Sequence, residues 1–348
     1  MASPLKLIGV FVAIVVLAVG GAAVAATAGG GDSQATGAEI SGQSPSQFQP
    51  GAVNHDADPE EGEIDVDASD RAARILVDTS HSNQISRSDV EPVVEAAFES
   101  SHFVEFGAGD NSKSYAETLS NYDALLIVQP QNGFSESERN AVQNYTEAGG
   151  RVVILGEPPQ VQAALGLFGV PSETSFGASN LTQSYGVQVG AEMLYNMGSE
   201  ATDNNFKSIY AVPGTDDNLT DGVETVNFDR SGYVVVNEEH DDADDIEVLY
   251  TAADGTRTLD TRREGEYATA VRSENLVLVA DSTFIQESDV YDADNEVFVG
   301  NLLDFLVSGD LNDDFPSDGV GSATEPPEPP EPPTPTPPEE ATPVSESS

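Results

Sequence analysis

A β-strand, an α-helix and a second β-strand can be read from the stretch ALLIVQPQNGFSESERNAVQNYTEAGGRVVIL, residues 124–155. Its two ends, 124–128 and 152–155, are short runs of Ala, Leu, Ile and Val, typical of strands that are buried on both faces. Between them, Ser135-Glu-Ser-Glu138 is a capping box that starts a helix, and the glycine pair 149–150 ends it. A helix that connects two buried strands indicates a parallel sheet with helices on its faces.

The same alternation continues on both sides of this stretch. The further elements predicted are strands 74–78, 103–106 and 276–280, helices 89–101 and 296–307, and antiparallel or edge strands 223–228, 233–236 and 246–250. Together they predict a single α/β domain over residues 71–309, with a mainly parallel sheet between two layers of helices.

The two ends of the chain differ in composition from this domain. Residues 7–28 are uncharged, apolar and long enough to span a bilayer, and Lys6 before them places the N-terminus in the cytoplasm. We therefore expect 1–28 to be a transmembrane anchor with the domain outside; a cleaved signal peptide and a secreted protein are the alternative. The acidic linker 29–70 and the Pro- and Glu-rich tail 310–348 are both expected to be disordered.

The charge composition is strongly acidic. The chain has 61 Asp and Glu against 13 Lys and Arg, a formal net charge of −48. Such a surface repels itself in dilute buffer, but molar salt shortens the Debye length to about 3 Å and screens the repulsion. The composition therefore predicts a halophile, and the scarcity of cations argues against a nucleic-acid partner.

Several motifs of the domain resemble those of one superfamily. They are Leu276-Val-Leu-Val-Ala-Asp-Ser-Thr-Phe284, Asp294-Asn295, Val297 to Leu306, Tyr122 to Val128, Gly149 to Leu155 and Leu167-Phe-Gly-Val170. In this order they are similar to the class I glutamine amidotransferase-like superfamily. Within it they resemble gliding-motility and ABC-transporter auxiliary domains, intraflagellar-transport-type domains and a halophile domain family of unknown function. The resemblance covers residues 71–309 and implies an amidotransferase-like, flavodoxin-like three-layer sandwich.

The catalytic signatures of such folds are missing from the sequence. Amidotransferases place a cysteine after the strand that here ends in Leu155-Gly-Glu-Pro-Pro159, and this chain contains no cysteine. The sequence also lacks a Gly-x-Ser-x-Gly elbow, a phosphate-binding Gly-Lys-Ser/Thr loop, a Gly-x-Gly-x-x-Gly turn and a His-Glu-x-x-His pair. We therefore expect a protein that is not an enzyme and that uses no cofactor.

Polar side chains follow the predicted parallel strands, where ligands of open α/β sheets bind. The candidate ligand-binding residues are Asp78, Ser80, His81, Asn83, Gln129, Asn132, Glu157, Asp281 and Ser282. The alternative interpretation is that they are turn and cap residues that satisfy loop amides. Asn295 has a role of this kind, as the expected cap of the helix 296–307.

Metal binding and glycosylation complete the set of candidate sites. The four histidines are scattered and the acidic runs 238–245 and 289–296 lack the spacing of a calcium loop, so no metal site is expected. Asn-x-Ser/Thr acceptor sequons occur at Asn144, Asn180 and Asn218, and they become relevant because the domain is expected outside the cell.

Three functions from different classes are compatible with these features. The first is a non-catalytic, membrane-anchored binding or assembly module outside the cell, whose partner is a membrane transporter, as the resemblance implies, or another surface protein. The second is a hydrolase or carbohydrate-active enzyme that uses carboxylates such as Asp78, Glu157 and Asp281. The third is a cell-surface spacer, in which the linker and the proline-rich tail hold the domain away from the membrane.

Overall fold

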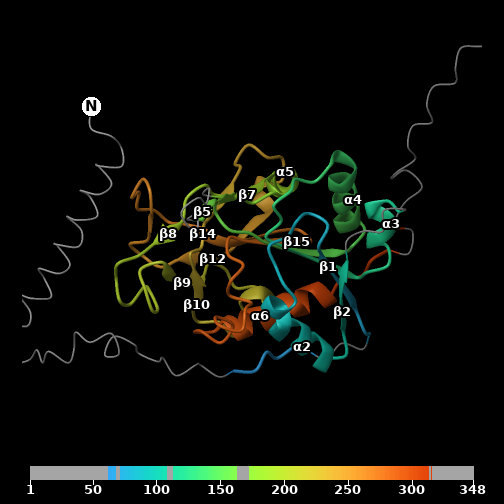
Figure 1. Cartoon of the computed structure of the whole chain (residues 1–348), viewed down its shortest axis with the longest axis horizontal. Coiled ribbons are helices and arrows are strands. Elements are labelled where there is room, and N and C mark those ends of the chain that lie inside the picture. The colour runs from blue at the N-terminus through green and yellow to red at the C-terminus, as the bar shows by residue number, and fades with distance from the viewer. Residues whose placement is uncertain (1–61, 68–70, 108–112, 163–171, 313–314, 316–348) are drawn as a thin grey trace, which may run out of the picture. The chain divides into compact units, whose positions relative to one another are not determined.

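A nine-stranded sheet forms the centre of the domain (Figure 1). The computed structural model describes residues 62–67, 71–107, 113–162, 172–312 and 315. The strand order of the nine-stranded sheet is β10-β9-β12-β14-β15-β4-β3-β1-β2. The strands are β1 (Arg74–Asp78), β2 (Phe103–Gly107), β3 (Ala124–Val128), β4 (Arg151–Leu155), β9 (Ser208–Pro213), β10 (Val226–Asp229), β12 (Ile246–Ala252), β14 (Ala268–Ser273) and β15 (Leu276–Val279).

Shorter strands and the helices surround this sheet. Three two-stranded ladders pair β5 (Gln160–Gln162) with β6 (Ser172–Thr174), β7 (Val187–Val189) with β11 (Val234–Val236), and β8 (Leu194–Tyr195) with β13 (Arg257–Thr258). The α-helices are α2 (Glu91–Glu99), α3 (Tyr115–Leu119), α4 (Glu136–Glu147), α5 (Ser179–Thr182) and α6 (Asn295–Val307).

The prediction of a mainly parallel sheet is correct for only half of it. The four pairings among β2, β1, β3, β4 and β15 are parallel. The four among β15, β14, β12, β9 and β10 are antiparallel. The strands between β4 and β15 in sequence enter the sheet through hairpins and loops instead of crossover helices, which is why they run antiparallel.

The parallel strands β1, β3, β4 and β15 are buried on both faces, as their continuous apolar runs predict, whereas the edge strand β2 is exposed or half-buried. Along β1, Ile75 and Val77 belong to one core and Leu76 to the other, because successive side chains of a strand point to opposite faces. The first core includes side chains of α2 and α6, and the second includes side chains of α3 and α4. Figure 1 shows α2 and α6 together on one side of the strands and α4 on the other. The described domain is therefore a mixed α/β fold whose parallel half has helices on both faces.

The helix predicted from the capping box is present. Glu138 N donates to Ser135 Oγ (3.3 Å), and Ser135 N donates to Glu138 Oε2 (2.7 Å). These two bonds satisfy amides that the first turn leaves without partners, which contributes about 1 kcal/mol for a serine cap.

The predicted role of Asn295 as a helix cap is wrong. The N-cap of α6 is Asp294, and Asn295 is the first helical residue and fully buried. The Asn295 side chain accepts from Asn227 N (2.9 Å) and donates to Asn227 O (2.9 Å), so it anchors α6 to the edge strand β10. Asp294 Oδ2 meanwhile accepts from the backbone N–H groups of Glu224 and Thr225. Asp294 and Asn295 thus connect the start of α6 to residues 224–227. An Asp-Asn pair before a helix has the same sequence whether it caps the helix or makes such contacts, so the sequence could not distinguish the two roles.

The packed domain extends beyond both ends of the range 71–309. In the segment assigned to the linker, Ile64 and Val66 pack against the first core. In the segment assigned to the tail, Phe315 is buried and its ring contacts Tyr145 edge-to-face, with centroids 5.4 Å apart. Ile64, Val66 and Phe315 are therefore part of the packed domain, although their neighbours in sequence are acidic residues or proline. The remaining linker, the tail after 315 and the apolar run 7–28 lie outside the described residues.

The described helices include none that is both long enough and apolar enough to cross a membrane.

Candidate functional site

The candidate residues lie where the parallel strands end. Asp78 ends β1, Gln129 follows β3, Glu157 follows β4, and Asp281 follows β15. Because these four strands run in the same direction, their carboxyl ends share one edge of the sheet. The structure places seven of the nine candidates in two groups, which we call the His81 cluster and the Glu157 cluster, and leaves Asn83 and Asn132 outside both.

The His81 cluster consists of Asp78, Ser80, His81, Tyr115 and Glu138. His81 Nδ1 lies 2.8 Å from Asp78 Oδ2, and Ser80 Oγ donates to Asp78 Oδ1 (2.5 Å). On the other side of the ring, His81 Nε2 lies 3.7 Å from Glu138 Oε2. Tyr115 Oη reaches towards Asp78 Oδ1 at 3.5 Å. The imidazole is therefore placed between two carboxylates.

The surroundings of His81 favour its charged form. Its ring is buried and stacks on Phe134, with centroids 3.6 Å apart and an interplanar angle of 19°. Burial by itself would lower the pKa of His81, but the hydrogen bond and charge of Asp78, followed by Glu138, outweigh it and raise the pKa. Burial also raises the pKa of Tyr115 well above its usual range, with a further contribution from Asp78.

The arrangement around His81 differs from a serine-hydrolase triad. In such a triad the acid binds one imidazole nitrogen and the serine binds the other. Here both Asp78 Oδ2 and Ser80 Oγ contact the same atom, His81 Nδ1, at 2.8 and 3.0 Å. Ser80 is consequently not placed for activation by His81, and its hydroxyl donates to Asp78 instead.

Asn83 and Asn132 hold loops together at this edge. Asn83 donates from Nδ2 to Val128 O (2.9 Å), which connects the loop after β1 to the end of β3. Asn132 Nδ2 donates to Ser82 Oγ (2.8 Å), and Asn132 N donates to His81 O (2.9 Å). These two candidates have the loop-fixing role that the alternative interpretation assigned to them.

The Glu157 cluster consists of Gln129, Glu157, Gln160, Asp281 and Ser282. Glu157 Oε1 accepts from Ser282 Oγ (2.5 Å), and its Oε2 accepts from Gln160 Nε2 (2.7 Å). Glu157 N donates to Gln129 Oε1 (2.8 Å). Gln129 itself has a φ of 39°, a left-handed backbone conformation that is uncommon outside glycine. The cluster joins residues that follow β3, β4 and β15.

Asp281 is fully buried within this cluster. One of its carboxyl oxygens, Oδ1, accepts from Thr283 N (2.7 Å), Thr283 Oγ1 (3.0 Å) and Phe284 N (3.1 Å). The other, Oδ2, is buried without a hydrogen-bond partner among the described residues. Burial and then the charge of Glu157 raise the pKa of Asp281 well above its usual range. Both effects favour the neutral form of Asp281, because an unpaired ionised carboxylate is costly to bury.

The pKa of Glu157 is also raised. Burial raises its pKa, while the hydrogen bond from Ser282 and the charge of Arg230 act in the opposite direction. The charge of Glu157 in turn contributes to the raised pKa of Asp281, so ionisation of Glu157 further disfavours ionisation of Asp281.

Sequence reasoning missed Tyr115, Phe134, Glu138, Gln160 and Arg230. Glu138 had a signal, since it is the third helical residue of a capping box that follows a candidate strand end. Phe134 and Gln160 are close in sequence to the candidates Asn132 and Glu157. Tyr115 and Arg230 come from distant segments, and their proximity depends on the packing of α3 and of the loop after β10. No local pattern marks them.

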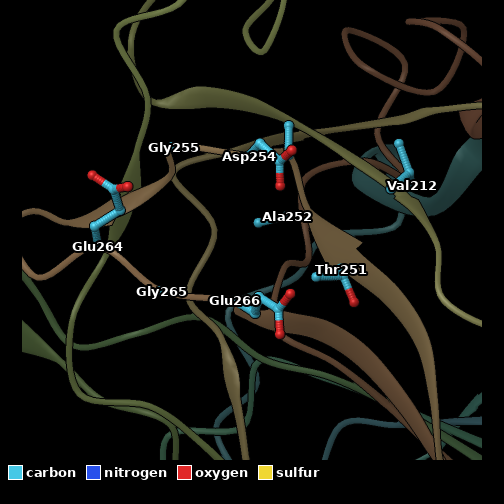
Figure 2. Close-up of a pocket in the computed structure, with 9 residues that line it drawn as sticks. Val212, Thr251, Ala252, Asp254, Gly255, Glu264, Gly265 and Glu266 are labelled. Atoms are coloured by element: carbon cyan, nitrogen blue, oxygen red, sulfur yellow. The ribbon is translucent and has the colours of Figure 1, made fainter.

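The described cavities lie away from both clusters. Figure 2 shows one of about 550 Å³, lined in part by Asp254, Glu264 and Glu266. It lies beside the ends of β9 and β12, and Glu264 is paired with Arg257. Within the described part of the chain, no group of three His, Asp or Glu side chains is arranged to hold a metal ion.

The three sequons differ in their surroundings. Asn180 accepts from Phe134 N (3.2 Å) and donates to Phe134 O (2.6 Å), so its amide fixes a loop. Asn144 is half-buried on α4. Asn218 is exposed in the 3-10 helix η5 (Asn218–Thr220). Of the three, Asn218 offers the freest acceptor amide.

Fold and site together define an α/β protein with a mixed sheet and two self-paired polar clusters at the carboxyl edge. The chain belongs to the family described as Domain of unknown function (DUF4350), whose model matches residues 102–303. No curated protein matches the sequence.

Solved structures are similar to this chain at low sequence identity. The mmIFT52 N-terminal domain matches with a TM-score of 0.52 and 11% identity, over 69% of this chain and 100% of that domain. A ThuA-like protein from Bacteroides uniformis has a TM-score of 0.42 and 12% identity, over 70% and 95% of the two chains. A glutamine amidotransferase from Thermotoga maritima has a TM-score of 0.38 and 9% identity, over 68% and 97%. The first similarity agrees with the resemblance to intraflagellar-transport-type domains, at the level of fold.

Proposed function

We propose that this chain is a non-catalytic binding or assembly module of a halophile, anchored in the cell membrane and facing outward, auxiliary to a transport system. The observation that carries the non-catalytic part is the pairing of polar groups at the carboxyl edge. Ser80 is bonded to Asp78, and Ser282 is bonded to Glu157. Both hydroxyls that could serve as nucleophiles therefore donate to carboxylates, and neither is aligned with a free imidazole nitrogen.

The outward location and the transport association rest on the sequence. The apolar run 7–28 preceded by Lys6 supports an anchor with the domain outside, and the resemblance to transporter auxiliary domains supports the partner class. The net charge of −48 supports a halophilic source. A surface spacer is the weaker alternative because it assigns no role to the folded domain itself.

Partner binding can be tested by purification from the source membranes. The full chain, extracted in mild detergent at molar KCl, is expected to bring down one or more membrane proteins in a constant ratio. High salt is retained throughout so that the acidic domain stays folded. Recovery of the chain alone from repeated extractions at this salt would contradict a stable assembly.

A carboxylate-dependent hydrolase is the second candidate, and one observation favours it. Asp281 and Glu157 both have raised pKa values, and the charge of Glu157 contributes to the shift of Asp281, as expected of two carboxyl groups that differ in role. Asp281 Oδ2 also lacks a described hydrogen-bond partner. Asp78, by contrast, belongs to the separate His81 cluster, so the structure leaves Glu157 and Asp281 as the only carboxylate pair among the three residues first considered.

The hydrolase can be distinguished by one substitution. If the pair were catalytic, the native chain would hydrolyse a polysaccharide in molar KCl, and Glu157→Gln would lower the rate by about a hundredfold or more. The proposed binding function predicts that neither protein releases reducing sugar above background. The matched control is Glu264→Gln, because Glu264 lies in the pocket of Figure 2, outside the cluster.

A further inference from the structure

A second candidate site lies at the opposite edge of the sheet. A cavity of about 460 Å³ is lined by the first residue of β4, Arg151, by Arg272 near the end of β14, and by Asp304 and Phe305 from the last turns of α6. Because Arg151 begins the strand that Glu157 follows, this cavity is separated from the Glu157 cluster by the length of β4. Its volume lies within the roughly 300–1,000 Å³ of small-molecule sites.

Two of the few cations of this chain meet in the cavity. The chain has 13 basic residues in all, so a pair of arginines in one pocket is a notable concentration. Arg272 is held in place by ion pairs to Asp217 (2.8 Å) and Glu247. Asp217 and Glu247 therefore hold the Arg272 guanidinium in one position in the absence of a ligand.

Arg151 retains unused hydrogen-bonding capacity. Its Nη1 donates to Asn275 Oδ1, and its guanidinium lies over the ring of Phe305, 4.8 Å from the centroid. Its Nε is buried and donates to no described atom. A guanidinium has five N–H donors in a planar fork that matches a carboxylate, so Arg151 is suited to bind one.

The remaining wall of the cavity is acidic. Asp304, Asp221 and Asp67 line it, and Asp304 Oδ1 is oriented by the backbone N–H of Asp67 (2.8 Å). A purely anionic ligand would be repelled by these three carboxylates, and a purely cationic one by the guanidinium of Arg151, which bonds to the neutral Asn275 and forms no ion pair among the described residues. A ligand that carries both a negative and a positive charge can pair with the arginine side and with the carboxylate side of the cavity at the same time.

We propose that this cavity binds a small zwitterion of the amino-acid class, with its carboxylate on Arg151 and its ammonium group facing Asp304 and Asp221. The proposal does not depend on the binding-module function, since it concerns another edge of the sheet and a small molecule. It assigns the chain a ligand site as well as a partner.

Titration calorimetry on the full chain in detergent and molar KCl tests the ligand class. The probes are the zwitterions L-alanine and 4-aminobutyrate, with butyrate and butylammonium as single-charge controls. At least one zwitterion is expected to bind about tenfold more tightly than either control. Equal or tighter binding of a control, or heat changes from none of the four, would overturn the proposal.

Two substitutions test the assigned residues. Arg151→Gln is expected to weaken zwitterion binding by about tenfold or more, because it removes a charge-assisted contact. Arg257→Gln is the matched control, since it removes an equal charge from an exposed pair outside the cavity. Circular dichroism establishes that each variant is folded.

Asp304→Asn keeps the proposal falsifiable if the arginine variant fails to fold. The amide oxygen still accepts from Asp67 N, so the change removes charge with little change of shape. It is expected to weaken zwitterion binding while leaving butyrate binding equal or stronger. If zwitterion affinity is unchanged in Asp304→Asn, the assigned orientation is wrong and the proposal falls.

Discussion

Asp281→Asn is expected to stabilise the domain at neutral pH. The folded-state pKa of Asp281 is raised, so its protonated form contributes stability that is complete below the unfolded pKa and is lost as pH rises through the folded pKa. Between those two values the free energy of unfolding falls by about 1.4 kcal/mol per pH unit. Asparagine has no proton to lose, and its oxygen can still accept the three bonds that Oδ1 receives.

The variant is expected to be more stable than the native chain at pH 7, and its stability should decline less steeply as pH rises above the unfolded-state pKa of the carboxyl group. Urea unfolding at a series of pH values in molar KCl measures both quantities. Asp245→Asn, at an exposed carboxylate, is the control and should leave the curve unchanged. A variant curve parallel to the native one, or a loss of stability at pH 7, would mean that Asp281 is ionised and paired in the folded state.

Removal of salt is expected to cost the domain most of its stability, about 5 kcal/mol or more. With 61 acidic and 13 basic residues, repulsion exceeds what ion pairs can offset, because each exposed pair contributes only about 0–1 kcal/mol. The Debye length grows from about 3 Å at 1 M to about 30 Å at 0.01 M salt, so the repulsion comes to act across the whole domain. An unfolded chain relieves it by expanding.

Circular dichroism and the urea midpoint of the full chain in nonionic detergent, followed from molar to millimolar KCl, measure this loss. Lowering the pH to about 4–5 in low salt should restore part of the signal, because protonation of carboxylates reduces the same charge. A midpoint that is equal in millimolar and molar KCl would remove the halophilic interpretation of the composition.

The parallel half of the fold could be predicted from the sequence because its strands are short apolar runs between periodic helices. β3, for example, is apolar at all five positions and buried at each. β14 was missed, since its sequence Ala-Thr-Ala-Val-Arg-Ser lacks both a continuous apolar run and large side chains. It is a strand because it lies between β12 and β15, a tertiary effect that outweighs local propensity.

The candidate site was predictable in location but not in organisation. Ser282 and Glu157 are 125 residues apart, yet both follow parallel strands, which is why they could be expected at one edge. The separation of Asp78 from Glu157 into different clusters depends on their partners: Glu138 approaches His81 from α4, whereas Gln160, three residues after Glu157, bonds to that carboxylate. The local Asp78–His81 contact required only a turn of three residues.

Crosslinking in intact membranes of the source cells tests the central claim, that the chain acts by binding a partner through an outward-facing domain. The account predicts that a membrane-impermeant crosslinker joins the chain to the same partner in the native protein and in a Glu157→Gln, Asp281→Asn double variant. This follows because Asp281 is fully buried and Glu157 is bonded to Ser282 and Gln160 within the domain, so neither carboxyl group is assigned to partner contact. Repeated recovery of only the uncrosslinked chain, in membranes where a known surface complex is crosslinked, would contradict it.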